Sequence, residues 1–213
     1  MSTGEVSLSG CKVVLIGGCY GVGKHALALR IAGILNASLS HVDDFRLVLQ
    51  HSTMPLQSSD LHFFIKSPGV PKEGIFRLPP EQLCDALKKE ADIVSKVLET
   101  VIASHITTGQ PVVLVGDCIV PSLAAKTRFA GIKADNKVRS VFIYEPDDSF
   151  FLKDIKVMDF NSDKGHFNEA WNEAMMRWQY GRWLAEEANS QQLPLVFARP
   201  QETLQDRVLQ ALG

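Results

Sequence analysis

The 213-residue sequence lacks the features that mark several classes of protein. It has no stretch of about 18 apolar residues, so we expect no membrane-spanning helix. It has four cysteines, and none of them belongs to a C-x-x-C pair or to a spacing typical of zinc ligands. Its 22 basic and 24 acidic residues leave a net charge of −2. Because basic residues are not in excess, the charge indicates neither nucleic acid nor an anionic membrane as a partner.

The bulk composition is ordinary for a globular protein, with 46% hydrophobic and 22% charged residues. The first ten residues, MSTGEVSLSG, are polar and contain no apolar signal core. With the cysteines outside any disulfide framework, we expect reduced thiols and a cytoplasmic protein. No repeat, low-complexity tract or linker divides the sequence, so we expect residues 1–213 to form a single domain.

Short apolar runs alternate with helical patterns along the chain. We predict strands at residues 12–16, 37–42, 111–115, 138–145 and 194–198. We predict helices at residues 25–35, 81–107, 169–189 and 202–212. Segment 51–80 holds five prolines and is expected to be mostly loop, and segment 149–164 is expected to be irregular. The alternation predicts an α/β fold with a five-stranded parallel sheet and right-handed crossovers.

A glycine-rich segment follows the first predicted strand. Residues 18–25 read GCYGVGKH and match the phosphate-binding pattern G-x-x-x-x-G-K. Glycines let the backbone wrap a phosphate with its N–H groups inward, and the following helix adds its positive end. We expect the phosphate-binding residues to be Gly18, Gly21, Val22, Gly23, Lys24 and His25. The alternative is a glycine-rich turn with a solvated lysine.

The last position of this segment departs from the pattern. A serine or threonine hydroxyl normally stands there and coordinates Mg²⁺, whereas this chain has His25. Imidazole is a poorer ligand for a hard cation, and its protonated form would repel Mg²⁺. The segment can still bind phosphate through its backbone, so the departure affects metal placement and turnover.

Acidic residues follow two other predicted strands. Asp43 follows the second strand and Asp117 the third, and the carboxyl ends of parallel strands open on one crevice. Such carboxylates can accept a proton from a substrate hydroxyl or hold Mg²⁺, and Arg46 can pair with an anionic substrate group. The alternatives are a helix N-cap at Asp43 or Asp44 and a simple turn at Asp117.

Two arginines lie on the long predicted helix after the irregular segment. Arg177 and Arg182 are candidates for a lid over residues 149–182 that neutralises charge on a transferring phosphoryl group. Solvated helix charges are the alternative interpretation. Other candidates for the same role are Lys153, Lys156 and Lys164.

Four segments resemble the P-loop small-molecule kinases of the adenylate-kinase-like class, in particular the 2-phosphoglycerate-kinase-like and zeta-toxin-like kinases. GGCYGVGKHALA resembles that group's GGxSGVGKST loop, and VDDFRLVLQ resembles its TDxxR element. VVLVGDCIVPSLA resembles the strand VVLEGDxxLP, which places Asp117 on the family aspartate and Pro121 on its proline. The final PLVFARPQETLQDRVLQAL resembles the base-side strand and last helix of such kinases.

The resemblance implies a three-layer P-loop fold with a helical lid, using ATP and Mg²⁺ to phosphorylate a hydroxyl of a small anionic metabolite. It implies that Lys24 holds the phosphates, that Asp43 orients or deprotonates the acceptor and that Asp117 helps to place the metal. Arg46 would bind the charge of the acceptor.

Two residues depart from the family pattern. His25 replaces the hydroxyl residue, and Val115 stands where the family strand often ends in glutamate. Both changes affect metal or substrate chemistry rather than phosphate binding. The alternative function is therefore a nucleotide-binding regulatory or degenerate kinase-like protein with little turnover.

Overall fold

The computed structural model describes residues 10–53, 57–64, 72–157 and 164–213. Its centre is a five-stranded sheet with the order β2-β3-β1-β6-β7. All neighbouring strands in it are parallel, which confirms the predicted sheet. Its strands are β1 (Val13–Gly18), β2 (Ser38–His41), β3 (Val112–Gly116), β6 (Val138–Tyr144) and β7 (Leu195–Phe197).

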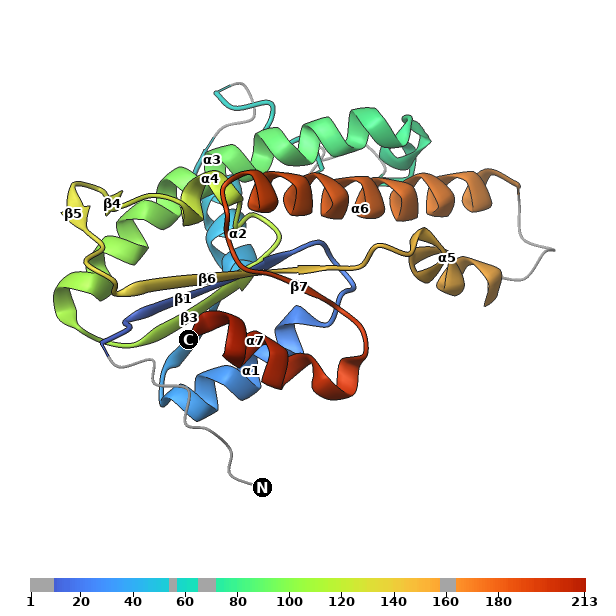
Figure 1. The fold of residues 1–213 in the computed structure, drawn as a ribbon. Coiled ribbons are helices and arrows are strands. Elements are labelled where there is room, and N and C mark those ends of the chain that lie inside the picture. The colour runs from blue at the N-terminus through green and yellow to red at the C-terminus, as the bar shows by residue number, and fades with distance from the viewer. Residues whose placement is uncertain (1–9, 54–56, 65–71, 158–163) are drawn as a thin grey trace.

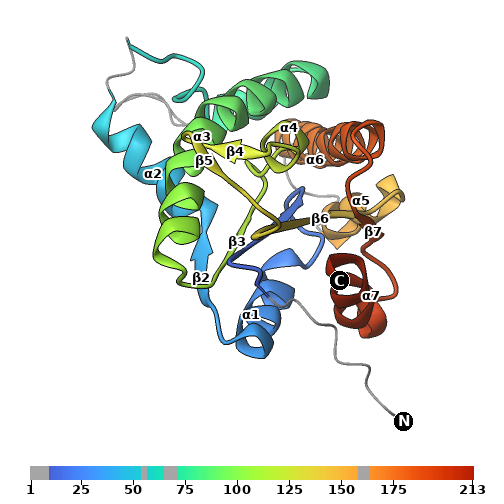
Figure 2. The ribbon, with the colours of Figure 1, turned by 60° about the vertical axis from the view of Figure 1, so that its left-hand side comes forward.

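Helices cover both faces of this sheet, and the molecule has three layers (Figures 1 and 2). One face is covered by α1 (Lys24–Leu35) and α7 (Leu204–Leu212). On the other face lie α2 (Val42–Ser52), α3 (Pro80–Thr108), α4 (Pro121–Ala124) and α6 (Lys164–Ser190). Because both faces are covered, all six residues of β1 are buried, which explains its unbroken apolar run.

The two long helices pack against each other above the sheet. Helix α3 begins with Pro80, where a missing N–H is tolerated, and ends at Gly109, which takes the left-handed conformation with φ 73°. Both predicted long helices are confirmed, although α6 begins five residues before the predicted start at residue 169. Two short 3₁₀ helices, Lys72–Arg77 and Gln201–Thr203, precede α3 and α7. In the described ranges, no helix is both long and apolar enough to cross a bilayer.

The prediction that residues 149–164 are irregular is wrong for most of that segment. Helix α5 (Asp148–Val157) occupies it, and residues 158–163 lie outside the described ranges. Asp147 Oδ1 accepts a hydrogen bond of 3.0 Å from the Ser149 backbone N–H. Hydrogen bonds from the side chain and then the backbone of Ser149 lower the pKa of Asp147. Phe151 then packs into the core. An acidic residue that caps the backbone ahead of two phenylalanines is a helix-start signal.

A small hairpin, β4 (Arg128–Phe129) and β5 (Ile132–Lys133), is added between α4 and β6. Its strands are only two residues long, so no alternating pattern indicated it in the sequence. Phe129 is fully buried and anchors the hairpin to the core.

The carboxyl ends of β1, β2 and β3 meet at one edge of the sheet because these strands are parallel and adjacent. Two of the following segments approach very closely: a Cβ added to Gly116, at the end of β3, would lie 2.5 Å from Cβ of Val42, the first residue of α2. Since Asp43 follows Val42 and Asp117 follows Gly116, this close packing sets the distance between the two acidic segments.

Replacing Gly116 by alanine tests this packing. We expect Gly116→Ala to lower the free energy of unfolding by about 1–3 kcal/mol, because overpacking forces α2 away from β3. The matched control is Gly33→Ala in α1, where an added Cβ meets no atom within 4 Å. This control is expected to raise stability by about 0.5–1 kcal/mol through helix propensity. Urea unfolding of the three proteins measures both effects, and equal stability of the two variants would contradict the packing.

Candidate functional site

The glycine-rich segment lies between β1 and α1, so the strand–loop–helix context that the motif requires is present. Gly21 and Gly23 have φ values of 94° and 87°, a region that glycine adopts without strain. The backbone amides of Gly21, Val22, Gly23 and Lys24 donate no hydrogen bond to the rest of the described chain. Gly23 also supplies no side-chain cap to α1. Unpaired amides at a helix N-terminus are the donors that an anion-binding nest uses.

Lys24 is almost completely buried, with 1% of its surface exposed. Its Nζ donates a hydrogen bond of 3.1 Å to the backbone carbonyl of Cys19, within the same loop. A buried ammonium needs such a partner because desolvation of an unpaired charge is costly. The alternative of a solvated lysine on a glycine-rich turn is therefore wrong.

His25 is half-buried at the start of α1, and its ring centroid lies 5.2 Å from that of His41. Burial and then the neighbouring charge of Lys24 lower the pKa of His25 below its ordinary value. The imidazole is consequently neutral at pH 7. It adds no positive charge that would repel a metal ion, although it still replaces the usual hydroxyl.

The thiol within the loop takes no part in nucleophilic chemistry. Cys19 is buried, and this burial raises the pKa of its thiol to about 12. It therefore stays protonated, and thiolate is the reactive form. All four cysteines are free thiols.

Asp43 and Asp117 lie at the same edge of the sheet, because the parallel pairing of β2 and β3 ends at His41 and Val115. His41 occupies the N-cap position of α2, and no side chain caps that helix. The capping alternative is therefore wrong for both Asp43 and Asp44. Asp43 lies in the first turn, where a negative charge interacts favourably with the positive end of the helix dipole. Its Oδ1 lies 3.1 Å from Arg46 Nη2.

Arg46 has a second carboxylate partner that sequence reasoning missed. Glu90 Oε2 lies 3.7 Å from Arg46 Nη1, and Glu90 is fully buried. Gln50 Nε2 donates a hydrogen bond of 2.8 Å to the other oxygen of this carboxylate. Burial raises the pKa of Glu90 to about 7, and the charge of Arg46 opposes that rise.

A signal for Glu90 exists in the sequence. Leu83, Leu87 and Val94 are buried at helical spacing, and Glu90 stands at the same spacing within this apolar stripe. A carboxylate in such a stripe indicates a buried partner of opposite charge.

Asp117 lies in the turn directly after β3, as the alternative of a simple turn predicts. The environment of its carboxylate goes beyond that alternative. Oδ1 is buried and has no hydrogen-bond partner among the described residues. Tyr180, fully buried on α6, donates a hydrogen bond of 2.8 Å from its hydroxyl to the Asp117 backbone carbonyl. The turn is thus held in place through its backbone, while Oδ1 of its carboxylate stays buried without a partner.

The glycine-rich segment of residues 18–25 is called the phosphate loop below, after its motif. A pocket of about 270 Å³ opens beside it, between this loop, α3 and α6. It contains Asp117 and Arg46 from the strand ends and Arg177 from α6. Arg177 forms an ion pair with Glu173 and lies 4.4 Å above the Tyr20 ring. The pocket is lined by Cys19, Tyr20, Arg46, Phe64, Phe76, Leu87, Asp117, Glu173, Met176, Arg177 and Tyr180.

The other lid candidates lie elsewhere. Arg182 lines a different pocket, between α3 and α6, where it pairs with Glu186 at 3.5 Å and lies over Trp178. Lys153 lies over the ring of Phe150. The side chains of two further candidates lie outside the described part of the structure; these are Lys156 and Lys164.

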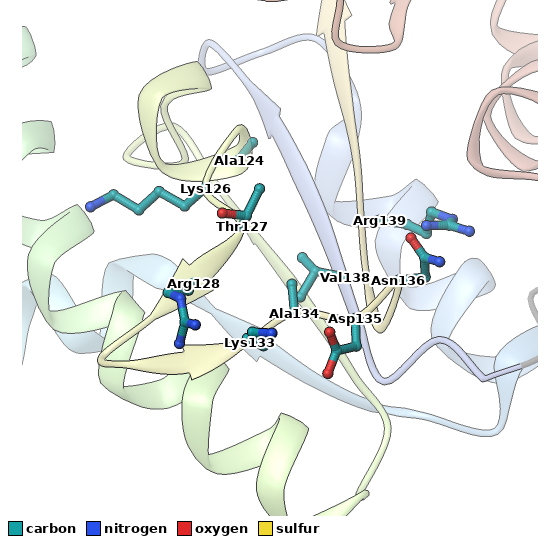
Figure 3. A pocket seen from close by; sticks show the side chains of 10 residues that line it. All are labelled: Ala124, Lys126, Thr127, Arg128, Lys133, Ala134, Asp135, Asn136, Val138 and Arg139. Carbon is teal, nitrogen blue, oxygen red and sulfur yellow. The ribbon is translucent and has the colours of Figure 1, made fainter.

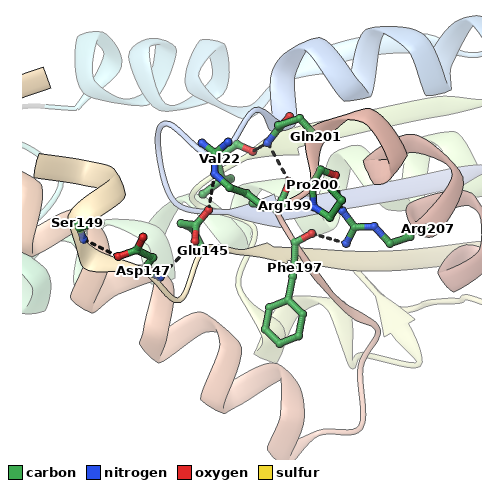
Figure 4. Close-up of polar contacts among 10 residues, drawn as sticks. Val22, Glu145, Asp147, Ser149, Phe197, Arg199, Pro200, Gln201 and Arg207 are labelled. Carbon is green, nitrogen blue, oxygen red and sulfur yellow. Dashed lines mark hydrogen bonds and ion pairs between the residues drawn. The ribbon is translucent and has the colours of Figure 1, made fainter. Parts of the chain in front are cut away.

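The segment after β7 is hydrogen-bonded to the phosphate loop (Figure 4). Gln201 Nε2 donates hydrogen bonds to the carbonyls of Val22, at 3.3 Å, and Ala198, at 2.9 Å. Arg199 Nε donates to the buried carboxylate of Glu145 at 3.1 Å, and its guanidinium lies 4.3 Å from the Phe150 ring. This segment therefore forms a wall beside the loop. In the sheet order, β3 and β7 lie on opposite sides of β1, so Asp117 and this wall lie on opposite sides of the loop.

A larger pocket, of about 450 Å³, lies near the β4–β5 hairpin (Figure 3). Its charged lining is mostly basic, with Lys126, Arg128, Lys133 and Arg139 against Asp135. It adjoins the first residues of β6, whereas the phosphate loop follows the last residue of the parallel strand β1. The two pockets are therefore at opposite edges of the sheet, and the predicted site residues lie away from the larger one.

The described residues include no group of three or more histidine, cysteine or acidic side chains that could hold a metal by themselves. Mg²⁺ in phosphoryl-transfer sites is usually held by one or two carboxylates together with phosphates and water. The unused oxygen of Asp117, with Asp43 at the same edge, fits that requirement.

No protein-family model matches the chain, and no curated protein matches its sequence. Among solved structures, the chain is similar to an uncharacterized protein from Eubacterium ventriosum ATCC 27560, with 15% identity and a TM-score of 0.43, over 94% of this chain and 97% of that one. It is also similar to the dephospho-CoA kinase from Campylobacter jejuni, with 12% identity and a TM-score of 0.36, over 93% of this chain and 94% of that one. At these values neither likeness assigns a function, which has to be argued from the site itself.

The raised pKa of Glu90 predicts a pH-dependent stability. Between about pH 4.5 and pH 7 the folded protein keeps this proton while the unfolded chain releases it, so the stabilising contribution is lost as pH rises. Glu90→Gln cannot titrate at this position. We expect its free energy of unfolding, relative to that of wild type, to rise by up to about 3 kcal/mol as pH increases across this range. Denaturant unfolding at pH 5, 6, 7 and 8 measures the difference. Parallel pH profiles of the two proteins would contradict a raised pKa.

Proposed function

We propose that this protein is an ATP-dependent phosphotransferase that phosphorylates a hydroxyl group of a small molecule. One observation carries the proposal: the unpaired amides and buried Lys24 of the phosphate loop adjoin a pocket that Asp117 lines. A donor phosphate and an acceptor hydroxyl could therefore meet at this edge of the sheet. Positioning and charge neutralisation supply most of the catalysis in phosphoryl transfer.

On the nucleotide side, the amides of residues 21–24 would bind phosphate oxygens, and Lys24 would exchange the Cys19 carbonyl for the β and γ phosphates. The wall formed by Arg199 and Phe150 offers a stacked guanidinium and ring beside the loop, a surface suited to a nucleobase. Gln201 would hold that wall against the loop.

On the acceptor side, Asp117 is the best-placed general base, because Asp117 lines the pocket, whereas Asp43 is not among the lining residues and is ion-paired with Arg46. Arg177 would face the transferring phosphoryl group from α6. Mg²⁺ would be held by the phosphates of the nucleotide with Asp43 and Asp117 as the nearest carboxylates, and it would neutralise phosphate charge.

A second candidate function is nucleotide binding with little turnover. The observation that favours it is His25, a neutral imidazole where a hard oxygen ligand is usual. ATP binding without transfer to any acceptor would support this candidate against the phosphotransferase.

The nucleotide site is tested with a lysine variant that keeps the apolar stem. We expect Lys24→Met to weaken ATP binding at least 30-fold in calorimetry, because a charge-assisted contact to phosphate is lost. The matched control, Lys133→Met, changes an exposed lysine of the larger pocket and should leave the affinity unchanged. Weaker binding in the control variant alone would move the nucleotide to the other edge of the sheet.

The catalytic role of Asp117 is tested by Asp117→Asn. We expect the phosphotransfer rate to fall by about 10²–10⁴, the usual contribution of a general base. The thermal unfolding midpoint should stay close to that of wild type, because the Tyr180 bond is to the backbone.

Asp44→Asn is the control for this experiment, since Asp44 is exposed in the first turn of α2. It should keep full activity. Normal activity in Asp117→Asn would remove Asp117 from the mechanism.

A further inference from the structure

The pocket of about 450 Å³ near the β4–β5 hairpin has no part in the proposed function (Figure 3). It adjoins the first residues of β6, whereas the wall beside the phosphate loop is bonded to Glu145, just after the last residue of that strand. Since a strand rises about 3.3 Å per residue, the length of β6 separates the two regions by roughly 20 Å. A ligand of this pocket would therefore be independent of the phosphate loop.

The charged lining of this pocket is strongly basic. It consists of four cations and one carboxylate, which are Lys126, Arg128, Lys133, Arg139 and Asp135. The whole chain has a net charge of −2, so this positive charge is local and not a general property of the protein. A concave site lined by charges of one sign concentrates the electrostatic potential and attracts ions of the opposite sign.

Two of these cations have partners within the protein. Lys126 Nζ lies 2.8 Å from Glu99 Oε1 on α3, which compensates its charge. Arg128 Nη1 donates a hydrogen bond of 3.1 Å to the Gly131 carbonyl in the hairpin turn. A carbonyl fixes the position of the guanidinium but does not neutralise it, so Arg128 keeps its full charge.

Arg128 and Lys133 are directly opposite each other in the two strands of the hairpin. Side chains at opposed positions project from the same face, and like charges in this arrangement destabilise a strand pair. Lys133 forms no hydrogen bond or ion pair through its side chain within the described ranges. An anion between these two groups would replace their repulsion by attraction.

Arg139, the second residue of β6, is half-buried. Its side chain has no hydrogen-bond or ion-pair partner in the part of the chain that the structure describes. A guanidinium carries five N–H donors in a planar fork that matches the oxygens of a phosphate. Because partial burial of a charge without a partner is unfavourable, an anion at this position would supply the missing acceptors.

The backbone that presents these cations is fixed. Phe129 is fully buried and anchors the hairpin. The Ala134 N–H donates to the Thr127 carbonyl at 3.0 Å, and the Lys137 N–H donates to the Ala134 carbonyl at 2.7 Å, which closes the turn into β6. A preformed arrangement of charges lowers the entropic cost of binding.

The remaining lining residues limit the kind of ligand. They are small, aliphatic or neutral and polar: Ala124, Thr127, Ala134, Asn136 and Val138. With no aromatic ring among the described lining residues, the pocket offers no surface on which a nucleobase would stack. Its volume of about 450 Å³ lies within the ~300–1,000 Å³ typical of sites for small molecules.

We propose that this pocket is a second anion site, which binds a compact soluble molecule with at least two phosphate groups and no nucleobase. The uncompensated cations come from two separate elements, so a single phosphate group would not contact all of them. One phosphate group binds between Arg128 and Lys133 of the hairpin, and another pairs with Arg139 of β6. The site does not depend on the proposed phosphotransferase function.

Titration calorimetry with tripolyphosphate and with orthophosphate tests this ligand class. The Lys24→Met protein is used, so that the phosphate loop contributes little, and the titrations are repeated on wild type. At low salt we expect tripolyphosphate to bind about tenfold or more tightly than orthophosphate, with an affinity that falls as NaCl is added. Equal affinities, or no binding of tripolyphosphate at millimolar concentration, would overturn the proposal.

Charge variants locate the binding. Lys133→Met should weaken tripolyphosphate binding about threefold or more, and the half-buried Arg139→Gln about tenfold or more. Asp135→Asn removes the carboxylate of the lining and should strengthen binding. The matched control is Lys96→Met, an exposed lysine of α3 that pairs with Asp92 and does not line the pocket.

The control separates a site from the general charge of the surface. Unchanged binding in Lys96→Met with losses in the two pocket variants supports the site, whereas equal losses in all three would overturn it. Tighter binding of a single-stranded oligonucleotide than of tripolyphosphate, lost in Lys133→Met, would replace the small ligand by nucleic acid and overturn the proposed class.

The same variants keep this proposal distinct from the proposed function. Lys133 and Arg139 lie at the edge of the sheet opposite to the phosphate loop, so their replacement should leave ATP affinity unchanged. Tripolyphosphate binding that depends on Arg139 supports the second site even if no phosphotransfer is found. Phosphotransfer in a protein whose tripolyphosphate binding ignores both cations would support the proposed function and overturn the second site.

Discussion

Arg46 lies between the carboxylates of Asp43 and Glu90, and these three groups dominate the electrostatics beside the pocket. Glu90 is fully buried, and the guanidinium compensates a charge that would otherwise be costly to bury. Arg46 itself lines the pocket, and its Nε has no hydrogen-bond partner among the described residues. The two carboxylates therefore fix the position of the guanidinium without using all of its donors.

The fold and the phosphate loop were predictable because their signals are local. Each buried strand appears as a short apolar run, and helices on both faces explain why these runs do not alternate. The loop is encoded by glycines whose spacing itself permits the backbone path, and Lys24 follows them directly. The parallel topology then placed Asp43 and Asp117 at one edge without any knowledge of side-chain contacts.

Pairing between distant side chains was not predictable. Arg46 and Glu90 are separated by 44 positions, and no local pattern in either segment indicates that their side chains pair. The sequence alone therefore did not show that Arg46 is flanked by two carboxylates. The sequence left both Arg177 and Arg182 as candidates for a similar reason: both lie on α6, and only the helix orientation decides which one lines the pocket beside the phosphate loop.

The hydrogen bond from Lys24 to the Cys19 carbonyl makes the loop its own competitor. Under the proposed function, a phosphate would compete with this carbonyl for the ammonium group, so its affinity would be a difference between two hydrogen-bonded states of Lys24. The same competition would assist departure, since the lysine would return to an internal partner as the phosphate leaves. An internal carbonyl partner would thus lower affinity and shorten residence time together.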